Sequence, residues 1–345
     1  MSQASLYRKY RPAEFKAVRG QEHITSVLEA AIKKGKPGHA YLFAGPRGTG
    51  KTSMARIFAR AIGTDEKDLY ELDAASHTGV DNVRELLDGV ATRPFASEFK
   101  VYIIDEVHML SKGAFNAFLK TLEEPPPFAL FILATTELGK VPQTIQSRCQ
   151  VFSFKSPTRA DLRAMVTDIA KQEGATIAPA GAELVALMGD GSYRDTLSIL
   201  QKVLTVSSDK KLSEDEVAAV VGAPKSATVG MFLSALAKRD TEGALSALHE
   251  ALSNGADAQT FVMLAIERAR AILLLRFGGK AMNGQVAEQF GEDEAETLLK
   301  LAGKDGEAIN SKTLAELIGA RIEMQRMPEP AIAIELAVYR LLETV

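Results

Sequence analysis

The sequence predicts an α/β domain with a parallel β-sheet, followed by a region built of α-helices. Over residues 1–154, short apolar runs alternate with segments in which apolar residues recur at helical spacing. From Ser156 onward the strand pattern disappears and helical spacing dominates. Alternation of strands and helices is typical of a parallel sheet covered on both faces, with its ligand at the carboxyl ends of the strands.

The α/β region contains the expected elements of a five-stranded sheet. We expect strands at 40–44, 69–73, 100–105, 130–136 and 149–154, and helices at 21–34, 51–62, 80–90 and 111–123. Ser111 is the expected N-cap of the last of these helices. The three prolines at 125–127 end it, because proline lacks a backbone N–H.

The helical region divides at a plausible linker, Gly222-Ala223-Pro224. Helices are expected at 158–173, 180–206 and 213–221, glycine-containing breaks at 254–256, 278–284 and 303–306, and a last helix at 331–344. We therefore expect three domains, at 1–155, 156–222 and 223–345.

The composition is that of an ordinary soluble globular protein, with 46% hydrophobic and 25% charged residues. The net charge of −3 gives no global signal for nucleic acid, although a local basic patch could still provide one. The chain has neither an apolar signal core nor a run of 18 apolar residues, so we expect a cytoplasmic protein without a membrane span. The single cysteine, Cys149, can form neither an internal disulfide nor a multi-thiolate zinc site.

A phosphate-binding loop is the most specific motif in the chain. The run Gly45-Pro46-Arg47-Gly48-Thr49-Gly50-Lys51-Thr52 matches G-x-x-x-x-G-K-S/T. Glycines let backbone N–H groups turn toward an anion, Lys51 supplies a positive charge for the β- and γ-phosphates, and Thr52 offers a hydroxyl to Mg²⁺. A chance match would not explain the strand before the loop and the helix after it.

Two carboxylates complete the predicted site. Asp105 and Glu106 follow directly on the apolar strand that begins at Lys100. We expect Asp105 to hold Mg²⁺, directly or through water, and Glu106 to polarise the attacking water. Such a pair is often an ordinary strand end, but the phosphate loop earlier in the chain favours the catalytic interpretation.

Three polar residues have two interpretations each on the residues alone. Thr136 could sense the γ-phosphate, or could simply belong to a threonine-rich strand edge. Arg148 is either a surface charge or an arginine finger that reaches a neighbour's nucleotide. Arg194, at a helix start, either folds back onto the γ-phosphate or pairs with Asp195. We expect His108 to pack beside the site.

In combination, these motifs resemble the gamma/tau family of bacterial DNA polymerase III subunits, the ATPase motors of the sliding-clamp loader. The resemblance is dense over residues 6–200 and only architectural beyond about residue 222. It rests on Tyr10-Arg11-Pro12, Gly20-Gln21-Glu22-His23, His39–Phe43 with the phosphate loop, Asp73-Ala74-Ala75-Ser76, Ile104–Ser111, Leu119–Pro126, Ala134-Thr135-Thr136, Ser147-Arg148-Cys149 and Gly191–Asp195.

The resemblance implies an AAA+ fold: a P-loop nucleotide domain, a helical lid and a helical collar that oligomerises. It implies that Arg148 is a finger acting in trans, that Thr136 is sensor 1 and that Arg194 is sensor 2. The segment Leu6–Val18 would form the adenine-side wall. The implied nucleotide-binding residues are Tyr7, Arg11, Pro12, Val18, Gly45, Pro46, Arg47, Gly48, Thr49, Gly50, Lys51, Thr52 and Ser53, and the implied Mg²⁺ ligands are Thr52 and Asp105.

The implied activity is ATP hydrolysis that opens a ring-shaped sliding clamp and places it on primed DNA. The implied partners are delta and delta-prime-like subunits, further copies of the same chain, the clamp and primer-template DNA. One alternative is a non-catalytic scaffold subunit, which the intact Lys51 and Glu106 argue against. Another is a branch-migration helicase of the same superfamily, which would turn over ATP with DNA alone.

The sequence departs from the family pattern in three places. Familiar members insert a four-cysteine zinc module after the phosphate-loop helix, whereas residues 61–69 here run straight through, so no zinc is expected. Basic residues that often follow Asp-Ala-Ala-Ser and face DNA are replaced by a stretch with His77 and Gly79. The long tail of tau is lacking, so we expect a short, gamma-like form.

Overall fold

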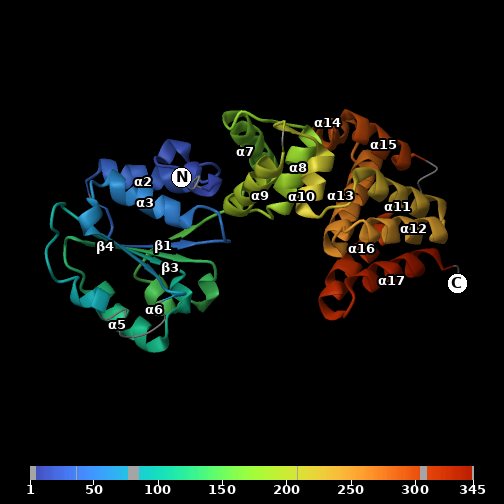
Figure 1. Cartoon of the computed structure of the whole chain (residues 1–345). Coiled ribbons are helices and arrows are strands. Elements are labelled where there is room, and N and C mark those ends of the chain that lie inside the picture. The colour runs from blue at the N-terminus through green and yellow to red at the C-terminus, as the bar shows by residue number, and fades with distance from the viewer. Residues whose placement is uncertain (1–4, 36, 77–84, 208, 304–308, 344–345) are drawn as a thin grey trace. The chain divides into compact units, whose positions relative to one another are not determined.

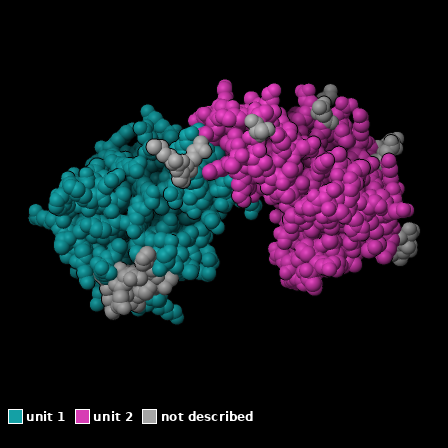
Figure 2. All heavy atoms as spheres, in the orientation of Figure 1, with its two compact units in different colours: residues 1–162, 189–198 teal, residues 163–188, 199–345 magenta. Residues whose placement is uncertain are grey.

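The computed structural model describes residues 5–35, 37–76, 85–207, 209–303 and 309–343. The chain forms two compact units (Figure 2). Unit 1 comprises Met1–Leu162 and Gly189–Ser198, and unit 2 comprises Arg163–Met188 and Ile199–Val345. The division into three functional domains stays a prediction.

Unit 1 is built on a five-stranded parallel sheet, as expected (Figure 1). Its strands are β1 (Ala40–Ala44), β2 (Leu69–Asp73), β3 (Lys100–Asp105), β4 (Ala129–Thr135) and β5 (Gln150–Ser153). The strand order is β2-β3-β4-β1-β5, so β4 lies between β1 and β3. Every residue of β1 and β4 is buried, which explains why these strands are continuous apolar runs.

Helices cover both faces of this sheet (Figure 1). The helices of unit 1 before residue 150 are α1 (Leu6–Lys9), α2 (Glu22–Lys33), α3 (Lys51–Ala61), α5 (Lys112–Glu123) and α6 (Gln143–Gln146). One apolar cluster packs α2 and α3 against the sheet through Ile24, Leu28 and Phe58, and the other packs α5 through Phe118. Ser111 caps α5 as expected, because its hydroxyl accepts a hydrogen bond from Ala114 N.

The helix expected at 80–90 lies partly outside the described residues, and residues 85–88 are helical. The other helices are α7 (Arg159–Gln172), α8 (Pro179–Met188), α9 (Tyr193–Val206), α10 (Glu214–Val221), α11 (Ser226–Lys238), α12 (Thr241–Ser253), α13 (Ala258–Phe277), α14 (Lys280–Phe290), α15 (Glu292–Ala302), α16 (Ser311–Glu323) and α17 (Pro330–Leu342).

Among the described residues, no single helix is long and apolar enough to cross a membrane. The bent pair α10–α11 meets the length and hydropathy criterion only when its two helices are taken together.

Three sequence-based expectations for the helical region need correction. A two-stranded parallel sheet, β6 (Thr176–Ile177) with β7 (Lys211–Leu212), occurs where no strand was expected, because two residues are too short to show an alternating pattern. The stretch 180–206 is two helices, separated where Asp190 and Gly191 adopt positive φ. The expected break at 278–284 is shorter, since α14 begins at Lys280.

A buried aspartate holds the loop before β3 in place. Asp68 is 1% exposed and accepts hydrogen bonds from the backbone N–H groups of Phe95, Ala96 and Ser97 at 2.5, 2.7 and 2.8 Å. Burial alone raises the pKa of Asp68, but these N–H groups and the Ser97 hydroxyl outweigh burial and hold the pKa below its ordinary value. The ionised carboxylate therefore stabilises the folded state.

We predict that Asp68→Asn lowers the free energy of unfolding by about 2–3 kcal/mol, because an amide cannot accept all of these N–H groups. In the unmodified protein the contribution of Asp68 is complete above the unfolded pKa of about 3.9 and is lost as the pH falls through the lower folded pKa. Urea unfolding between neutral and acidic pH measures both effects. The control is Asp65→Asn, since asparagine can keep the cap that Asp65 provides to Lys67 N. Equal stability of the two variants would contradict this role of Asp68.

Candidate active site

The phosphate loop connects the buried strand β1 to α3. Gly48 and Gly50 have φ values of 71° and 101°, which favour glycine because side chains are strained there. Gly45 N donates to Thr135 O at 3.1 Å, so the loop continues the pairing of β1 with β4. The sequence therefore places glycines where the backbone needs them.

Lys51 begins α3 and lies inside the loop. Its Nζ donates to Gly45 O at 2.7 Å and to Pro46 O at 2.8 Å, and the residue is 6% exposed. Burial holds the pKa of Lys51 below its ordinary value, and the charges of Glu106 and Asp105 oppose that effect. The ammonium group thus has oxygen partners that phosphate oxygens could replace.

The two expected Mg²⁺ ligands contact each other. Thr52 Oγ1 donates to Asp105 Oδ2 at 2.6 Å, while Asp105 Oδ1 accepts from Glu106 N at 3.0 Å. A hydroxyl and a carboxylate are hard oxygen donors, and Mg²⁺ completes such a set with waters and substrate phosphates. The residues present therefore fit Mg²⁺.

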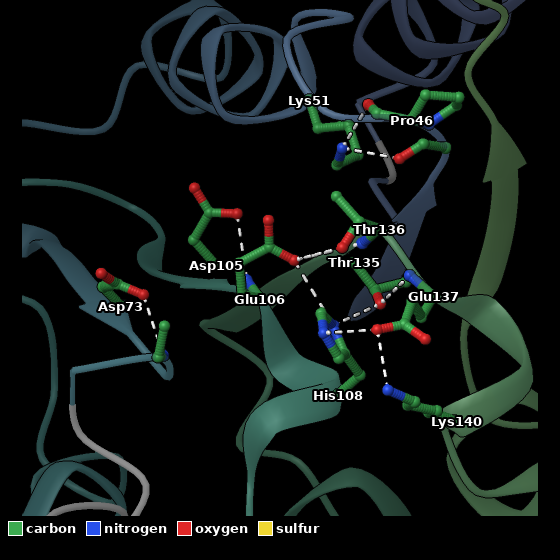
Figure 3. Close-up of polar contacts among 12 residues, drawn as sticks. Pro46, Lys51, Asp73, Asp105, Glu106, His108, Thr135, Thr136, Glu137 and Lys140 are labelled. Atoms are coloured by element: carbon green, nitrogen blue, oxygen red, sulfur yellow. Dashed lines mark hydrogen bonds and ion pairs between the residues drawn. The ribbon is translucent and has the colours of Figure 1, made fainter. Parts of the chain in front are cut away.

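Glu106 is held against the end of β4. Its Oε2 accepts from Thr136 N at 3.2 Å and from Thr136 Oγ1 at 3.0 Å (Figure 3). The Glu106 backbone has φ 48°, a left-handed conformation that is uncommon for a residue with a side chain. The structure thus brings the predicted water-activating residue and the predicted sensor into direct contact.

The N-terminal segment and the start of α9 lie beside the loop. The guanidinium of Arg194 is 5.9 Å from the centre of the Tyr7 ring, and its charge lowers the pKa of Lys51 further. Burial, with the charges of Arg56 and Arg194, lowers the pKa of Arg11. Val18 packs against the apolar cluster around α3, and Pro12 is partly buried. Tyr7, Arg11 and Arg194 therefore share one region with Lys51.

Ser192 and Tyr193 form a contact with the loop that sequence reasoning missed. Tyr193 N donates to Gly48 O at 3.1 Å, and a Cβ atom added to Gly48 would lie 1.9 Å from Ser192 Oγ. Ser192 is 4% exposed. The only signal for this contact was that Ser192 precedes Arg194 at a helix start.

The remaining loop residues differ in exposure. Thr49 is buried and donates from Oγ1 to Pro46 O at 2.9 Å, which closes the loop on itself. Pro46 and Arg47 are exposed, and Ser53 is partly buried on the first turn of α3. The exposed residues are free to contact a ligand or another chain without disturbing the core.

Arg148 makes its contacts with other elements. Its guanidinium donates to Thr144 O at 2.8 Å and to Glu123 Oε1 at 2.6 Å, and its side chain is 34% exposed. No contact among the described residues joins Arg148 to Lys51 or Glu106. The adjacent Cys149 packs against the core, where burial raises its pKa to about 12, so the thiol stays protonated.

Two expectations have no direct test in the structure. No group of three or more His, Cys, Asp or Glu residues that could hold a metal occurs within the described part of the chain, and the absence of zinc stays a prediction. His77 and Gly79, where the sequence departs from the expected family pattern, lie outside the described residues.

Two protein-family profiles match the chain. The profile described as "DNA polymerase III, delta subunit" matches residues 20–78 and 64–158. The profile described as "DNA polymerase III subunits gamma and tau domain III" matches residues 212–345. The two matches lie on either side of the region that holds α7, α8 and α9.

Curated relatives match over nearly the full chain. DNA polymerase III subunit tau of Bacillus subtilis is 39% identical, over 100% of this chain and 64% of its own length. DNA polymerase III subunit gamma/tau of Mycobacterium tuberculosis is 37% identical, over 98% of this chain and 62% of its own length. The chain therefore spans less than two thirds of the length of these relatives.

Among solved structures, the RuvB Holliday junction branch migration motor of Thermotoga maritima is similar, with a TM-score of 0.52 and 23% identity. The similarity covers 73% of this chain and 87% of that one, and at this identity it shows the fold alone. That fold is the AAA+ fold that the resemblance to the gamma/tau family implied. The sequence relatives are more specific, and they show that the chain belongs to the gamma/tau family of bacterial DNA polymerase III subunits.

Proposed function

We propose that the chain is the ATPase motor subunit of a DNA polymerase III clamp loader. The observation that carries this proposal is that Lys51, the Thr52–Asp105 pair and the Glu106–Thr136 pair occupy the same edge of the parallel sheet. These are the groups that phosphate binding, Mg²⁺ binding and water activation require. A scaffold subunit would not need all three.

ATP binds with its phosphates in the loop of residues 45–52. Backbone N–H groups and Lys51 Nζ face the phosphate oxygens, and Ser53 adds to this end of α3. Mg²⁺, held by Thr52 and Asp105, would neutralise charge on the β- and γ-phosphates. Tyr7, Arg11, Pro12 and Val18 form the adenine side of the site.

Glu106 acts as the general base for the attacking water. Thr136 donates two hydrogen bonds to Oε2 of Glu106, from its backbone N–H and from its hydroxyl. The other carboxylate oxygen, Oε1, is therefore the one that can accept a hydrogen bond from that water. As sensor 1, Thr136 thereby links the base to the end of β4. Arg194, as sensor 2, stabilises the γ-phosphate from the same chain, and its guanidinium is supported by the Tyr7 ring.

Arg148 serves the nucleotide of a neighbouring subunit. Its side chain is one-third exposed and its partners, Glu123 and Thr144, belong to α5 and α6 rather than to its own phosphate loop. A planar, always charged guanidinium suits the charge that develops on a transferred phosphoryl group. The active assembly therefore contains this chain next to a second nucleotide-binding subunit.

The proposed partners are further copies of this chain, delta and delta-prime-like subunits, a ring-shaped sliding clamp and primer-template DNA, all in the cytoplasm. Residues 1–155 bind nucleotide, 156–222 act as the lid, and 223–345 form the collar that assembles the subunits. ATP binding opens the clamp, and hydrolysis releases it on DNA. Zinc has no part in this scheme.

ATP hydrolysis measured with primed DNA, with clamp, and with both tests the proposal. Stimulation that requires clamp and DNA together supports a clamp loader. Full turnover with DNA alone would instead indicate a branch-migration motor, the function named for the RuvB structure. Absence of turnover in every assembly would indicate a scaffold subunit.

We predict that Lys51→Ala abolishes tight ATP binding, whereas Glu106→Gln binds ATP and loses turnover. The first change removes a phosphate contact and the second removes the base, so each should cost several orders of magnitude, about 10³-fold or more, at its own step. Nucleotide titration and steady-state hydrolysis separate the two steps. Normal turnover by Glu106→Gln would show that Glu106 is not the base.

We predict that Arg148→Ala leaves ATP affinity of the isolated chain unchanged and reduces hydrolysis in the assembly by roughly 10³–10⁵-fold. Arg194→Ala, by contrast, should weaken ATP binding in the isolated chain. Arg93→Ala is the control, because Arg93 is another exposed arginine of unit 1 and has no proposed role in binding or assembly.

Mixing Arg148→Ala subunits with Lys51→Ala subunits tests whether the finger acts in trans. Adjacent mixed subunits can form a site with one intact loop and one intact finger, so part of the turnover should return. If mixed assemblies form without any recovery, and Arg148→Ala alone already fails to bind ATP, then Arg148 has a structural role within its own chain.

A further inference from the structure

His108 lies in a polar cluster directly behind the proposed base. It belongs to the short 3₁₀ turn Val107–Met109 that follows Glu106, and its side chain is 6% exposed. Nearby side chains come from the end of β4 and from the turn after it (Figure 3). A buried histidine among carboxylates and hydroxyls needs polar partners for both ring nitrogens.

Each ring nitrogen of His108 has such a partner. Nδ1 lies 2.9 Å from Thr135 Oγ1 and 3.4 Å from Glu106 Oε2, while Nε2 lies 3.5 Å from Glu137 Oε1. Glu137 in turn accepts from Lys140 Nζ at 2.9 Å. That hydrogen bond and the neighbouring charges hold the pKa of Glu137 below its ordinary value, so Glu137 is a stable anionic partner.

His108 also supports the residue that binds Glu106 from the other side. Thr135 Oγ1, the partner of Nδ1, accepts a hydrogen bond from Glu137 N at 3.0 Å. This contact closes the backbone turn whose middle residue is Thr136. The imidazole therefore contacts the Glu106 carboxylate directly and, through Thr135, fixes the turn that supplies the two donors from Thr136.

We infer that His108 is a positioning residue for Glu106 in ATP hydrolysis. Three groups meet at Oε2 of Glu106: Thr136 N, Thr136 Oγ1 and His108 Nδ1. With Oε2 fixed, Oε1 is held toward the attacking water. The left-handed backbone of Glu106 is strained and persists only where surrounding contacts determine it. This inference rests on the proposed ATPase function.

His108→Ala should lower kcat by about 10- to 100-fold, because a misplacement of the base by about 1 Å has an effect of this size. The affinity for ATP should change less than about twofold, since no phosphate contact is removed. His23→Ala is the control, because His23 is a histidine of unit 1 that contacts Ser153 O at 3.1 Å without touching Glu106. Thermal unfolding shows whether each variant folds.

Two conservative variants show which ring nitrogen of His108 is needed for turnover. They also replace His108→Ala in the experiment if that variant does not fold. His108→Asn keeps a nitrogen near the Nδ1 position, and His108→Gln keeps one near the Nε2 position. We expect His108→Asn to restore more turnover, because Nδ1 is the atom that faces Glu106 and Thr135. Equal rates for the two variants, or better recovery by His108→Gln, would overturn the inference.

A double-mutant cycle separates positioning from a merely structural role. If His108 acts through Glu106, then His108→Ala should cause no further loss of single-turnover rate in the Glu106→Gln background. An equal loss in both backgrounds would reject the inference. Failure of the unmodified chain to hydrolyse ATP in any assembly would reject the proposed function instead. Normal turnover by every His108 variant, alongside an inactive Glu106→Gln, would reject only the role of His108.

Discussion

The parallel pairing of β4 with β1 on one side and β3 on the other determines the geometry of the candidate site. In this register Ala44 lies opposite Thr135, and Ile104 lies opposite Leu133. Because all of these strands run the same way, the residues that follow them reach one edge of the sheet together. The phosphate loop, the carboxylates of Asp105 and Glu106, and the hydroxyls of Thr135 and Thr136 meet at this edge. No long loop is needed to bring these groups together.

The sequence predicted this part of the molecule well, for a physical reason. Strands that are buried on both faces are mostly apolar, so β1, β3 and β4 stand out as short apolar runs, and β3 and β4 end in the polar residues Asp105 and Thr135. Their polar ends then identify the site. The predicted neighbours Thr52 and Asp105 are in fact hydrogen-bonded.

Other contacts could not be predicted, because they join segments far apart in the chain by packing alone. Nothing near Gly48 indicates that Ser192 will cover it, and nothing near His108 indicates that Glu137 will face its Nε2. Such partners depend on tertiary structure rather than on local spacing. The role of Arg148 stays a prediction for a related reason, since its proposed partner belongs to another subunit.

Several of the buried polar residues of unit 1 lie around this edge of the sheet. Lys51, Thr49, Thr135 and Ser192 are each buried there, next to a backbone conformation at Glu106 that is strained. Buried polar groups destabilise a protein unless they are hydrogen-bonded. The side chains of Lys51, Thr49 and Thr135 each have a hydrogen-bond partner, at 2.7, 2.9 and 2.9 Å respectively. The apolar clusters on the two faces of the sheet contribute stability that offsets the cost of these buried polar groups and of the strained backbone at Glu106.

The contact between the phosphate loop and the start of α9 adds a mechanical constraint. Tyr193 N is bonded to Gly48 O, and Ser192 lies against Gly48 so closely that no side chain fits between them. A nucleotide that shifts the loop must therefore either move the first turn of α9 or break this bond. Arg194 lies on that same turn. As long as the hydrogen bond between Tyr193 N and Gly48 O persists, the loop proposed to hold the phosphates and the arginine proposed to sense them move together, so the position of a γ-phosphate would affect both.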